Sequence, residues 1–202
     1  MRPLYIVSII AILSGEALTD QVLWSYSMSE IPPGWYINDG TWTFELDGAH
    51  SSAAAYLYET VWNDLRSNQL ILPPGTDSVG VSAGEVSATW ETDLLETFSL
   101  ARIYATVNGA GGIYWNVSAG DSDSLPVSFV IPAVAGDTIA FQLVCAAICN
   151  PPPPTPQPGP GPQATATFQI RDFVVTAYGT IVGLEPASWG SIKAHGVSYK
   201  YR

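Results

Sequence analysis

Apolar and polar residues alternate along most of residues 21–178 with a period of two, the spacing of a strand that buries one face. The alternation is regular over residues 125–131 and 139–145. Turn residues separate such runs, and one of these turns, Asn108-Gly109, is typical of a two-residue hairpin. Only residues 59–66 have a helical pattern. The sequence therefore predicts an all-β fold, a two-sheet antiparallel β-sandwich of the jelly-roll type.

The last predicted strand, residues 164–178, contains one break in its alternation. Ile170 and Phe173 both belong to the apolar set, although they are three positions apart, an odd spacing that would place them on opposite faces of a regular strand. A β-bulge at Arg171-Asp172 would bring both halves of the strand onto one face. The remaining strands are expected mainly at residues 53–58, 68–72, 79–90 and 113–117.

The first 17 residues have the pattern of an export signal: an apolar run over residues 4–13 follows a basic residue, and the small residues Gly15 and Ala17 precede the expected cleavage site. We expect cleavage before Leu18. A membrane-spanning helix needs about 20 apolar residues, so this run is too short to span. No later segment is apolar enough to span a membrane, which predicts a secreted or cell-surface protein without a transmembrane segment in its mature chain.

Charge separates the chain into a body and a tail. The chain has a net charge of −11, and residues 18–180, predicted to form one sandwich domain, contain three arginines and no lysine. Such a surface repels phosphate backbones, which excludes nucleic acid as a partner. Residues 151–162 are rich in proline, which lacks the amide donor of a sheet, and are expected to form a loop insertion. Residues 181–202 form a basic tail.

The two cysteines, Cys145 and Cys149, are four residues apart. In an oxidising compartment this spacing favours a local disulfide. The alternative is a pair of free, buried thiols at the end of a strand. Two thiols without a histidine at ligand spacing do not make a structural zinc site.

Several short motifs follow one another in a characteristic order along residues 22–179. They are Pro33-Gly34-Trp35, Trp42, Gly48, His50-Ser51-Ser52, residues 70–73, Val107-Asn108-Gly109, Gly112, Tyr114-Trp115, residues 131–136 and residues 170–175. In this order they resemble the jelly-roll domains of the MAM and cleaved-adhesin type, extracellular modules of bacterial surface proteins and eukaryotic receptors. The resemblance implies a concanavalin-like sandwich used for adhesion or glycan binding. The sequence Trp189-Gly190-Ser191-Ile192-Lys193 in the tail is similar to endings of exported bacterial proteins, which implies a sorting or attachment segment.

Aromatic residues in or beside loops are the candidates for glycan binding, because sugar rings pack their C–H faces on aromatic planes. The candidates are Trp35, Tyr36, Trp62, Tyr114 and Trp115, and packing into the core is the alternative for each. Trp24, Trp42 and Trp90 are in phase with strand cores and are expected to be buried. We therefore expect a non-catalytic binding module for a glycan or an extracellular protein. A structural surface or matrix component is a further alternative.

One acidic segment has an enzymatic interpretation. Glu91, Asp93 and Glu96 have the Glu-x-Asp-x-x-Glu spacing of laminarinase-like glucanases, and this resemblance implies a small retaining β-glycanase. The chemistry needs two carboxylates about 5 to 5.5 Å apart, and a bulge would be required to bring Glu91 and Glu96 to one face. The alternative is a solvated acidic connection between two strands.

Acidic turns are candidates for a calcium site, because hard cations prefer carboxylate and carbonyl oxygens. The candidate ligands are Asp121, Asp123 and Asp172, although no segment has the spacing of a complete ligand loop. Asp172 could instead pair with Arg171. His50 is the one histidine of residues 18–180, so any Ser-His-Asp triad would depend on it; the alternative is a turn residue.

Overall fold

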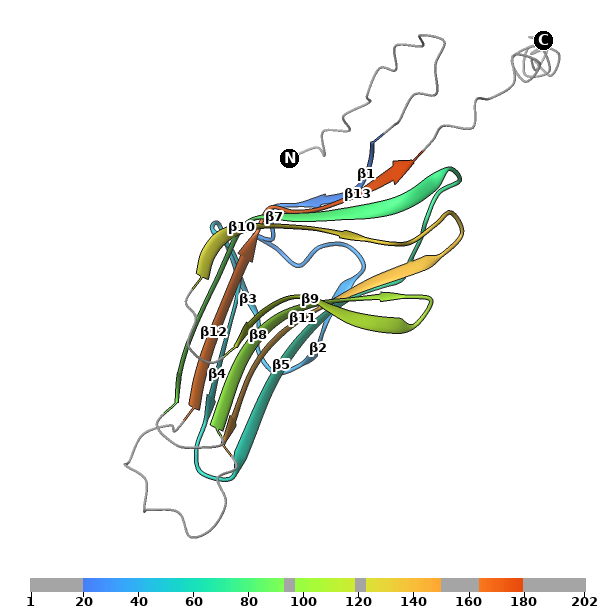
Figure 1. Ribbon diagram of the computed structural model, residues 1–202. Coiled ribbons are helices and arrows are strands. Elements are labelled where there is room, and N and C mark those ends of the chain that lie inside the picture. Colours follow the sequence, from blue (N-terminus) through green and yellow to red (C-terminus); the bar gives the residue numbers. More distant parts are fainter. Residues whose placement is uncertain (1–19, 93–96, 119–122, 150–163, 180–202) are drawn as a thin grey trace, which may run out of the picture.

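The computed structural model describes residues 20–92, 97–118, 123–149 and 164–179. These residues form strands and turns, and no helix occurs among them. The strands make two antiparallel sheets that pack on each other, which confirms the predicted two-sheet β-sandwich (Figure 1). The predicted export signal, the proline-rich insertion and the basic tail lie outside the described residues.

The seven-stranded sheet has the order β1-β13-β7-β12-β4-β3, and β10 pairs with β7 beside this path. Its strands are β1 (Gln21–Tyr26), β3 (Thr43–Glu45), β4 (Gly48–Ala55), β7 (Thr76–Thr92), β10 (Asp123–Ile131), β12 (Ala164–Arg171) and β13 (Phe173–Gly179). The first part of β7 pairs with β13 and the second part with β12. Figure 1 shows this long strand changing direction where β13 gives way to β12.

The predicted β-bulge does not occur at the junction of β12 and β13, because both strands pair with β7 in one unbroken register, with Arg171 opposite Glu85 and Val174 opposite Ser82. Asp172 separates the two strands and has a φ of 53°, in the left-handed region that non-glycine residues seldom adopt. Across the junction lies Gly84, where an added Cβ would sit 2.8 Å from a carboxylate oxygen of Asp172. Ile170 and Phe173 are both fully buried, so the left-handed conformation of Asp172 restores the phase without an extra residue in the strand.

The six-stranded sheet has the order β2-β5-β11-β8-β9, and the short β6 also pairs with β11. Its strands are β2 (Trp35–Asp39), β5 (Glu59–Ser67), β6 (Leu70–Ile71), β8 (Thr97–Val107), β9 (Ala110–Ser118) and β11 (Thr138–Cys149). The Asn108-Gly109 turn joins β8 to β9 with both residues at positive φ, as predicted for a two-residue hairpin.

The helical interpretation of residues 59–66 is wrong, because these residues lie in β5. Every residue from Glu59 to Arg66 pairs with a residue of β11. Thr60, Val61 and Trp62 also belong to the residue types that favour strands. The ladder to β11 therefore decides the conformation of a segment whose local pattern was ambiguous.

The core lies between the sheets and is centred on aromatic rings. Phe141 of the six-stranded sheet meets Phe173 of the seven-stranded sheet edge to face, with ring centroids 5.3 Å apart. Trp42 packs in the same way on Phe168, at 5.7 Å. The expected burial of Trp42 is confirmed. Trp24 is half-buried and packs on Phe141, while the side chain of Trp90 is outside the description.

The two cysteines do not form the predicted disulfide. Cys145 and Cys149 are free and buried on the same strand, β11. Four residues of extended strand span about 13 Å, whereas the Cα atoms of a disulfide lie about 4.4 to 6.8 Å apart. The alternative of two free thiols is therefore the correct one. Burial raises the pKa of the Cys145 thiol to about 12, so this thiol is unreactive near neutral pH.

A thiol titration tests this arrangement. In denaturant without a reducing agent, we expect two reactive thiols per chain. In the folded protein near pH 8, neither thiol should react quickly, because both are buried and the reactive species is the thiolate. Finding no thiols in the denatured protein would mean that a disulfide forms, and it would contradict the continuous pairing of β11.

Candidate ligand-binding site

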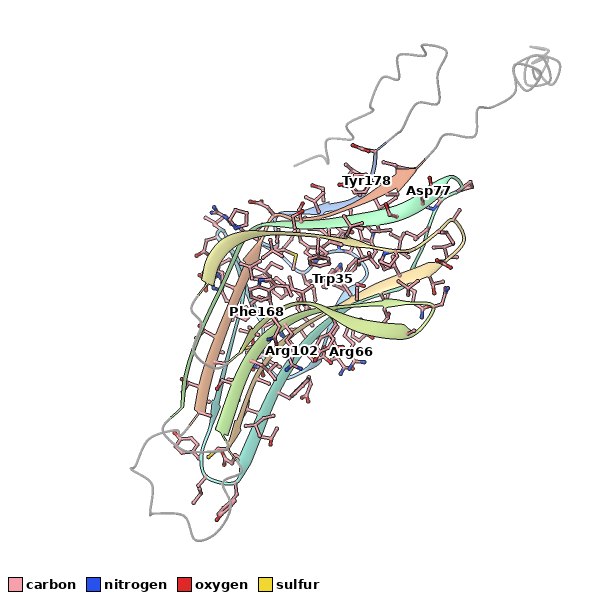
Figure 2. All side chains as sticks on the ribbon, viewed as in Figure 1. Trp35, Arg66, Asp77, Arg102, Phe168 and Tyr178 are labelled. Atoms are coloured by element: carbon pink, nitrogen blue, oxygen red, sulfur yellow. The ribbon has the colours of Figure 1, made fainter. Side chains whose placement is uncertain are left out.

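The six-stranded sheet has an outer face, which we define as the side that points away from the core between the sheets. Side chains alternate along a strand, so neighbours point to opposite faces. On β5, Leu65 points into the core, whereas Trp62, Asp64 and Arg66 belong to the outer face. In Figure 2, Arg66 lies on the outer side of this sheet, while Trp35 lies between the sheets.

The register of the strands assembles the outer face into three rows that cross β5, β11 and β8. Because β11 pairs with both neighbours without a shift, residues that are far apart in the sequence become direct cross-strand neighbours. The rows are Trp62, Ala146 and Leu100; Asp64, Val144 and Arg102; and Arg66, Gln142 and Tyr104. On β9, Asn116 extends the second row.

The centre of the outer face is an apolar floor covered by two aromatic rings. Val144 and Ala146 have no exposed surface, although they point away from the core, and Leu100 is also buried. Trp62 and Tyr104 pack against these three residues and remain half-exposed. The rings therefore have one side supported by the sheet and another side available to a ligand.

A buried carboxylate lies beside the floor. Asp64 is 1% exposed, and its Oδ2 atom accepts hydrogen bonds from Nε of Arg66 at 2.7 Å and from Nδ2 of Asn38 at 3.0 Å. The bond with Asp64 raises the pKa of the Arg66 guanidinium above its ordinary value. The Oδ1 atom of Asp64 is also buried and has no hydrogen-bond donor among the described residues. It is an acceptor held in a fixed position without a partner.

The second arginine of the outer face is held by neutral groups. Nε of Arg102 donates to Oδ1 of Asn116 at 2.6 Å, and Nη1 donates to the Tyr104 hydroxyl at 2.7 Å. The guanidinium carbon lies 5.9 Å from the centre of the Tyr104 ring. Within the described ranges, no carboxylate forms an ion pair with Arg102. Its position is thus fixed, and no acid of the described part of the chain contacts its charge.

The outer face is an electrostatic exception in this acidic chain. Residues 18–180 contain three arginines and no lysine, and two of these arginines, Arg66 and Arg102, belong to the outer face. Asp64 neutralises only one of them by direct contact. Carboxylate, guanidinium and amide groups therefore surround a pair of aromatic rings, and this arrangement can bind hydroxyls and apolar ring surfaces together.

The structure brings two of the predicted aromatic candidates to the outer face. Trp62 covers the floor, and Tyr36 of β2 pairs in register with Arg66 and is 44% exposed. Trp35, by contrast, is a core residue that is 6% exposed and packs on Phe173 at 5.6 Å. Trp115 is half-buried and stacks on Phe168.

Trp35 and Trp115 were expected in or beside loops. Both lie in strands instead, where the alternation of side chains turns them toward the core. The side chain of Tyr114 is outside the description. The residues that sequence reasoning missed are Asp64, Arg66, Arg102, Tyr104 and Asn116.

The enzymatic and calcium candidates can be placed only in part. Glu91 lies in β7 and Asp123 in β10, but their side chains are not described, and Asp93, Glu96 and Asp121 lie outside the described residues. Asp172 is 3.8 Å from Nε of Arg171, the ion pair that the sequence offered as an alternative to a calcium ligand.

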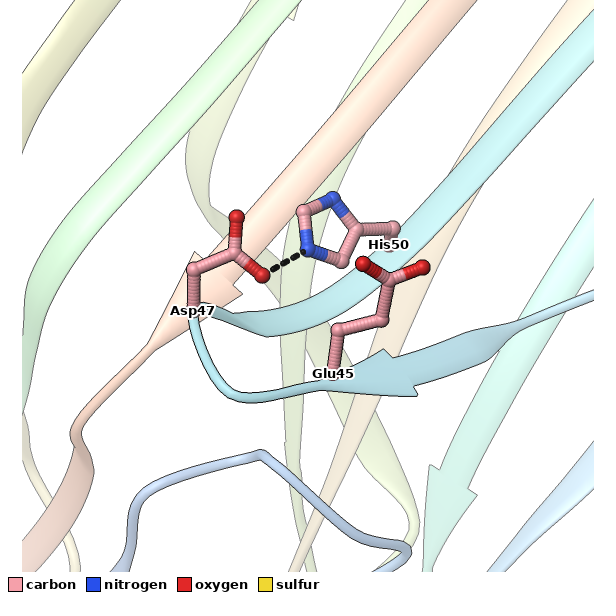
Figure 3. A group of neighbouring side chains, drawn as sticks. All are labelled: Glu45, Asp47 and His50. Carbon is pink, nitrogen blue, oxygen red and sulfur yellow. Dashed lines mark hydrogen bonds and ion pairs between the residues drawn. The ribbon is translucent and has the colours of Figure 1, made fainter.

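A second group of polar side chains lies on the hairpin of β3 and β4, in the seven-stranded sheet. Nε2 of His50 and Oδ1 of Asp47 are 2.9 Å apart, and this hydrogen bond lowers the pKa of Asp47 (Figure 3). Glu45 completes a group whose donor atoms lie within 4.8 Å of one another and could hold a metal ion.

Among the described residues, no hydrogen bond joins the same histidine to a serine hydroxyl. Ser51 is buried, and its hydroxyl donates to the backbone carbonyl of Thr41 rather than to His50. His50 and Ser51 are consecutive in β4 and so point to opposite faces of the sheet. The partner of His50 is Asp47 in the turn.

Comparisons with known proteins add little to this description. No family model matches the chain, and no curated protein matches it. Eight chains of solved structures match. One is a carbohydrate-binding module, TmCBM61, in complex with β-1,4-galactotriose. It is 14% identical with a TM-score of 0.34, and the match covers 74% of this chain and 91% of that chain. A likeness of this degree identifies no ligand, and the MAM or cleaved-adhesin resemblance stays a prediction. Among the described residues, no helix is long and apolar enough to cross a membrane.

Replacing Arg66 tests the buried carboxylate. Breaking a buried ion pair by removing one partner costs about 3 to 5 kcal/mol. The Arg66 side chain is 42% exposed, so we expect Arg66→Ala to lower the free energy of unfolding by a smaller amount, about 2 kcal/mol, in urea denaturation.

Arg102→Ala is the matched control, because Arg102 lies on the same face and has no carboxylate partner in the described part of the chain. We expect a loss below about 1 kcal/mol for this variant, in line with neutral surface contacts. Equal losses of unfolding free energy in the two variants would show that the buried Asp64 carboxylate does not need its ion pair with Arg66.

Proposed function

We propose that this chain is a non-catalytic module that binds a glycan on the outer face of its six-stranded sheet. The observation that carries the proposal is the aromatic cover of that face. Trp62 and Tyr104 lie on a buried apolar floor, with hydrogen-bonding side chains fixed beside them. Aromatic planes accommodate the C–H faces of sugar rings, and the neighbouring polar groups can bind sugar hydroxyls.

The polar groups are preorganised, which supports a binding role. Arg66 and Asn38 hold Asp64 in place, and Asn116 and Tyr104 hold Arg102. A ligand would therefore meet side chains that are already ordered, which reduces the entropy lost on binding. Among the described residues, the hydrogen bonds of Arg102 use only Nε and Nη1, so its remaining N–H groups can donate to a sugar hydroxyl. Asp64 is buried and contributes by holding Arg66 in place.

Export is part of the same proposal. The pattern of residues 1–17 supports secretion or display at the cell surface, where glycans are available to a binding module. The basic segment 181–202 would then serve as a sorting or attachment element. Adhesion to an extracellular protein through the same face is the alternative for this binding role, and the experiment below separates the two.

Substitution of the two aromatic residues tests the proposal. The protein is screened on a glycan array, and its affinity for each glycan that it binds there is measured by calorimetry. We expect Trp62→Ala and Tyr104→Ala each to weaken binding by about tenfold or more, because aromatic anchors supply most of the energy of such contacts.

Tyr56→Ala is the matched control, because Tyr56 is 50% exposed in the turn between β4 and β5, away from the outer face. This variant should bind with unchanged affinity. Retained binding in both outer-face variants would reject the proposed site. Capture of an extracellular protein on this face, without any glycan, would reject the ligand class.

The export signal has its own test. When the full chain is expressed in a host that exports it, N-terminal sequencing of the exported protein should begin at Leu18. A protein that stays inside the cell with residues 1–17 attached would contradict export and would leave the glycan site untouched.

A further inference from the structure

The hairpin of β3 and β4 carries three metal-ligating side chains that have no part in the proposed glycan site. Glu45 comes from the end of β3, Asp47 from the turn and His50 from β4. A carboxylate oxygen of each acid and a ring nitrogen of the histidine all lie within 4.8 Å of one another. Figure 3 shows the three side chains turned toward a common point.

The strand register explains why these side chains meet. His50 pairs with Thr43, and Glu45 pairs with Gly48, so Glu45 and His50 project from the same side of the hairpin. The turn between them is fixed against the neighbouring strand. Gly48 has a φ of 125°, and an added Cβ there would lie 2.4 Å from the backbone oxygen of Ile170 in β12. Three donors thus sit on a short, tightly held element.

A side chain from β12 orients one of the three ligands. Nε2 of Gln169 lies 3.1 Å from the backbone oxygen of Asp47 and 3.4 Å from its Oδ2 atom. Asp47 is therefore held by an amide donor on one oxygen, while its other carboxylate oxygen faces His50. Outer hydrogen bonds of this kind fix the direction of metal ligands.

The donor set selects the class of ion. One imidazole nitrogen with two carboxylate oxygens suits a borderline divalent ion such as Zn²⁺, whereas Ca²⁺ takes oxygen ligands in larger number. Three protein ligands leave a position open on the metal. His50 borders a hollow of about 340 Å³ whose lining includes the polar residues Thr43, Ser52, Thr167 and Gln169. The open position therefore has room for water or for a small oxygen ligand.

We propose that Glu45, Asp47 and His50 bind one divalent transition-metal ion, with Zn²⁺ as the ion that fits the donors best. The ion replaces the proton between His50 and Asp47 and coordinates both atoms. Its charge compensates the two carboxylates, which stand beside one histidine in a chain with a net charge of −11. Arg171 acts electrostatically on Asp47, and its Nε atom also lies 3.8 Å from Oδ2 of Asp172.

Titration with Zn²⁺ alone tests the site. The full mature chain is titrated by calorimetry, and Co²⁺ is used in parallel because its visible spectrum reports coordination by nitrogen and oxygen. We expect one ion per chain. His50→Ala and Glu45→Gln should each weaken binding by about tenfold or more, as the loss of a ligand should cost at least as much as the loss of an outer hydrogen bond.

Glu30→Gln is the matched control, because it removes one exposed carboxylate outside the hairpin. This variant should bind Zn²⁺ as the parent does. Circular dichroism checks that each variant is folded, and Glu45→Gln keeps the test decisive if His50→Ala does not fold. No saturable binding, binding that is unchanged in both hairpin variants, or equal affinity for Ca²⁺ would each overturn the proposal. None of these outcomes bears on glycan binding.

Discussion

The structure depends on strand β11, which is buried on both of its faces. Leu143 and Cys145 point into the core, while Val144 and Ala146 point outward and are equally buried. A strand of this kind has no polar side that could tolerate a shift, so its register with β5 and β8 is strongly specified. A slip by one residue would break the core and the outer face together. The outer face, where we propose that the ligand binds, is thus positioned by the same ladder that holds the sandwich.

This dual role explains which parts of the fold were readable from the sequence. A period of two identifies strands, and the break between Ile170 and Phe173 located an irregularity at Arg171-Asp172. In the structure this irregularity is a left-handed residue, Asp172, rather than the expected bulge. The errors came where spacing was interpreted without pairing. Two cysteines on one strand looked like a local loop, and residues 59–66 looked helical until the ladder to β11 decided their conformation.

The outer face was harder to predict, for a physical reason. Arg66 and Arg102 are far apart in the sequence, and only the pairing of β5, β11 and β8 makes them members of one surface. Leu100 and Tyr104 share one face of β8, and their spacing alone does not distinguish an outer face from a core. The scarcity of cations in residues 18–180 was the available signal, since two of three arginines lie there.

The central claim is that the ligand lies on the outer face of the six-stranded sheet. The most direct measurement is a titration of the isotope-labelled protein with a retained glycan, followed by amide and indole NMR shifts. The account predicts that the largest changes occur at Trp62, Tyr104 and Val144, with little change in the β3 and β4 hairpin. Changes confined to the seven-stranded sheet, with the Trp62 indole unaffected, would contradict it.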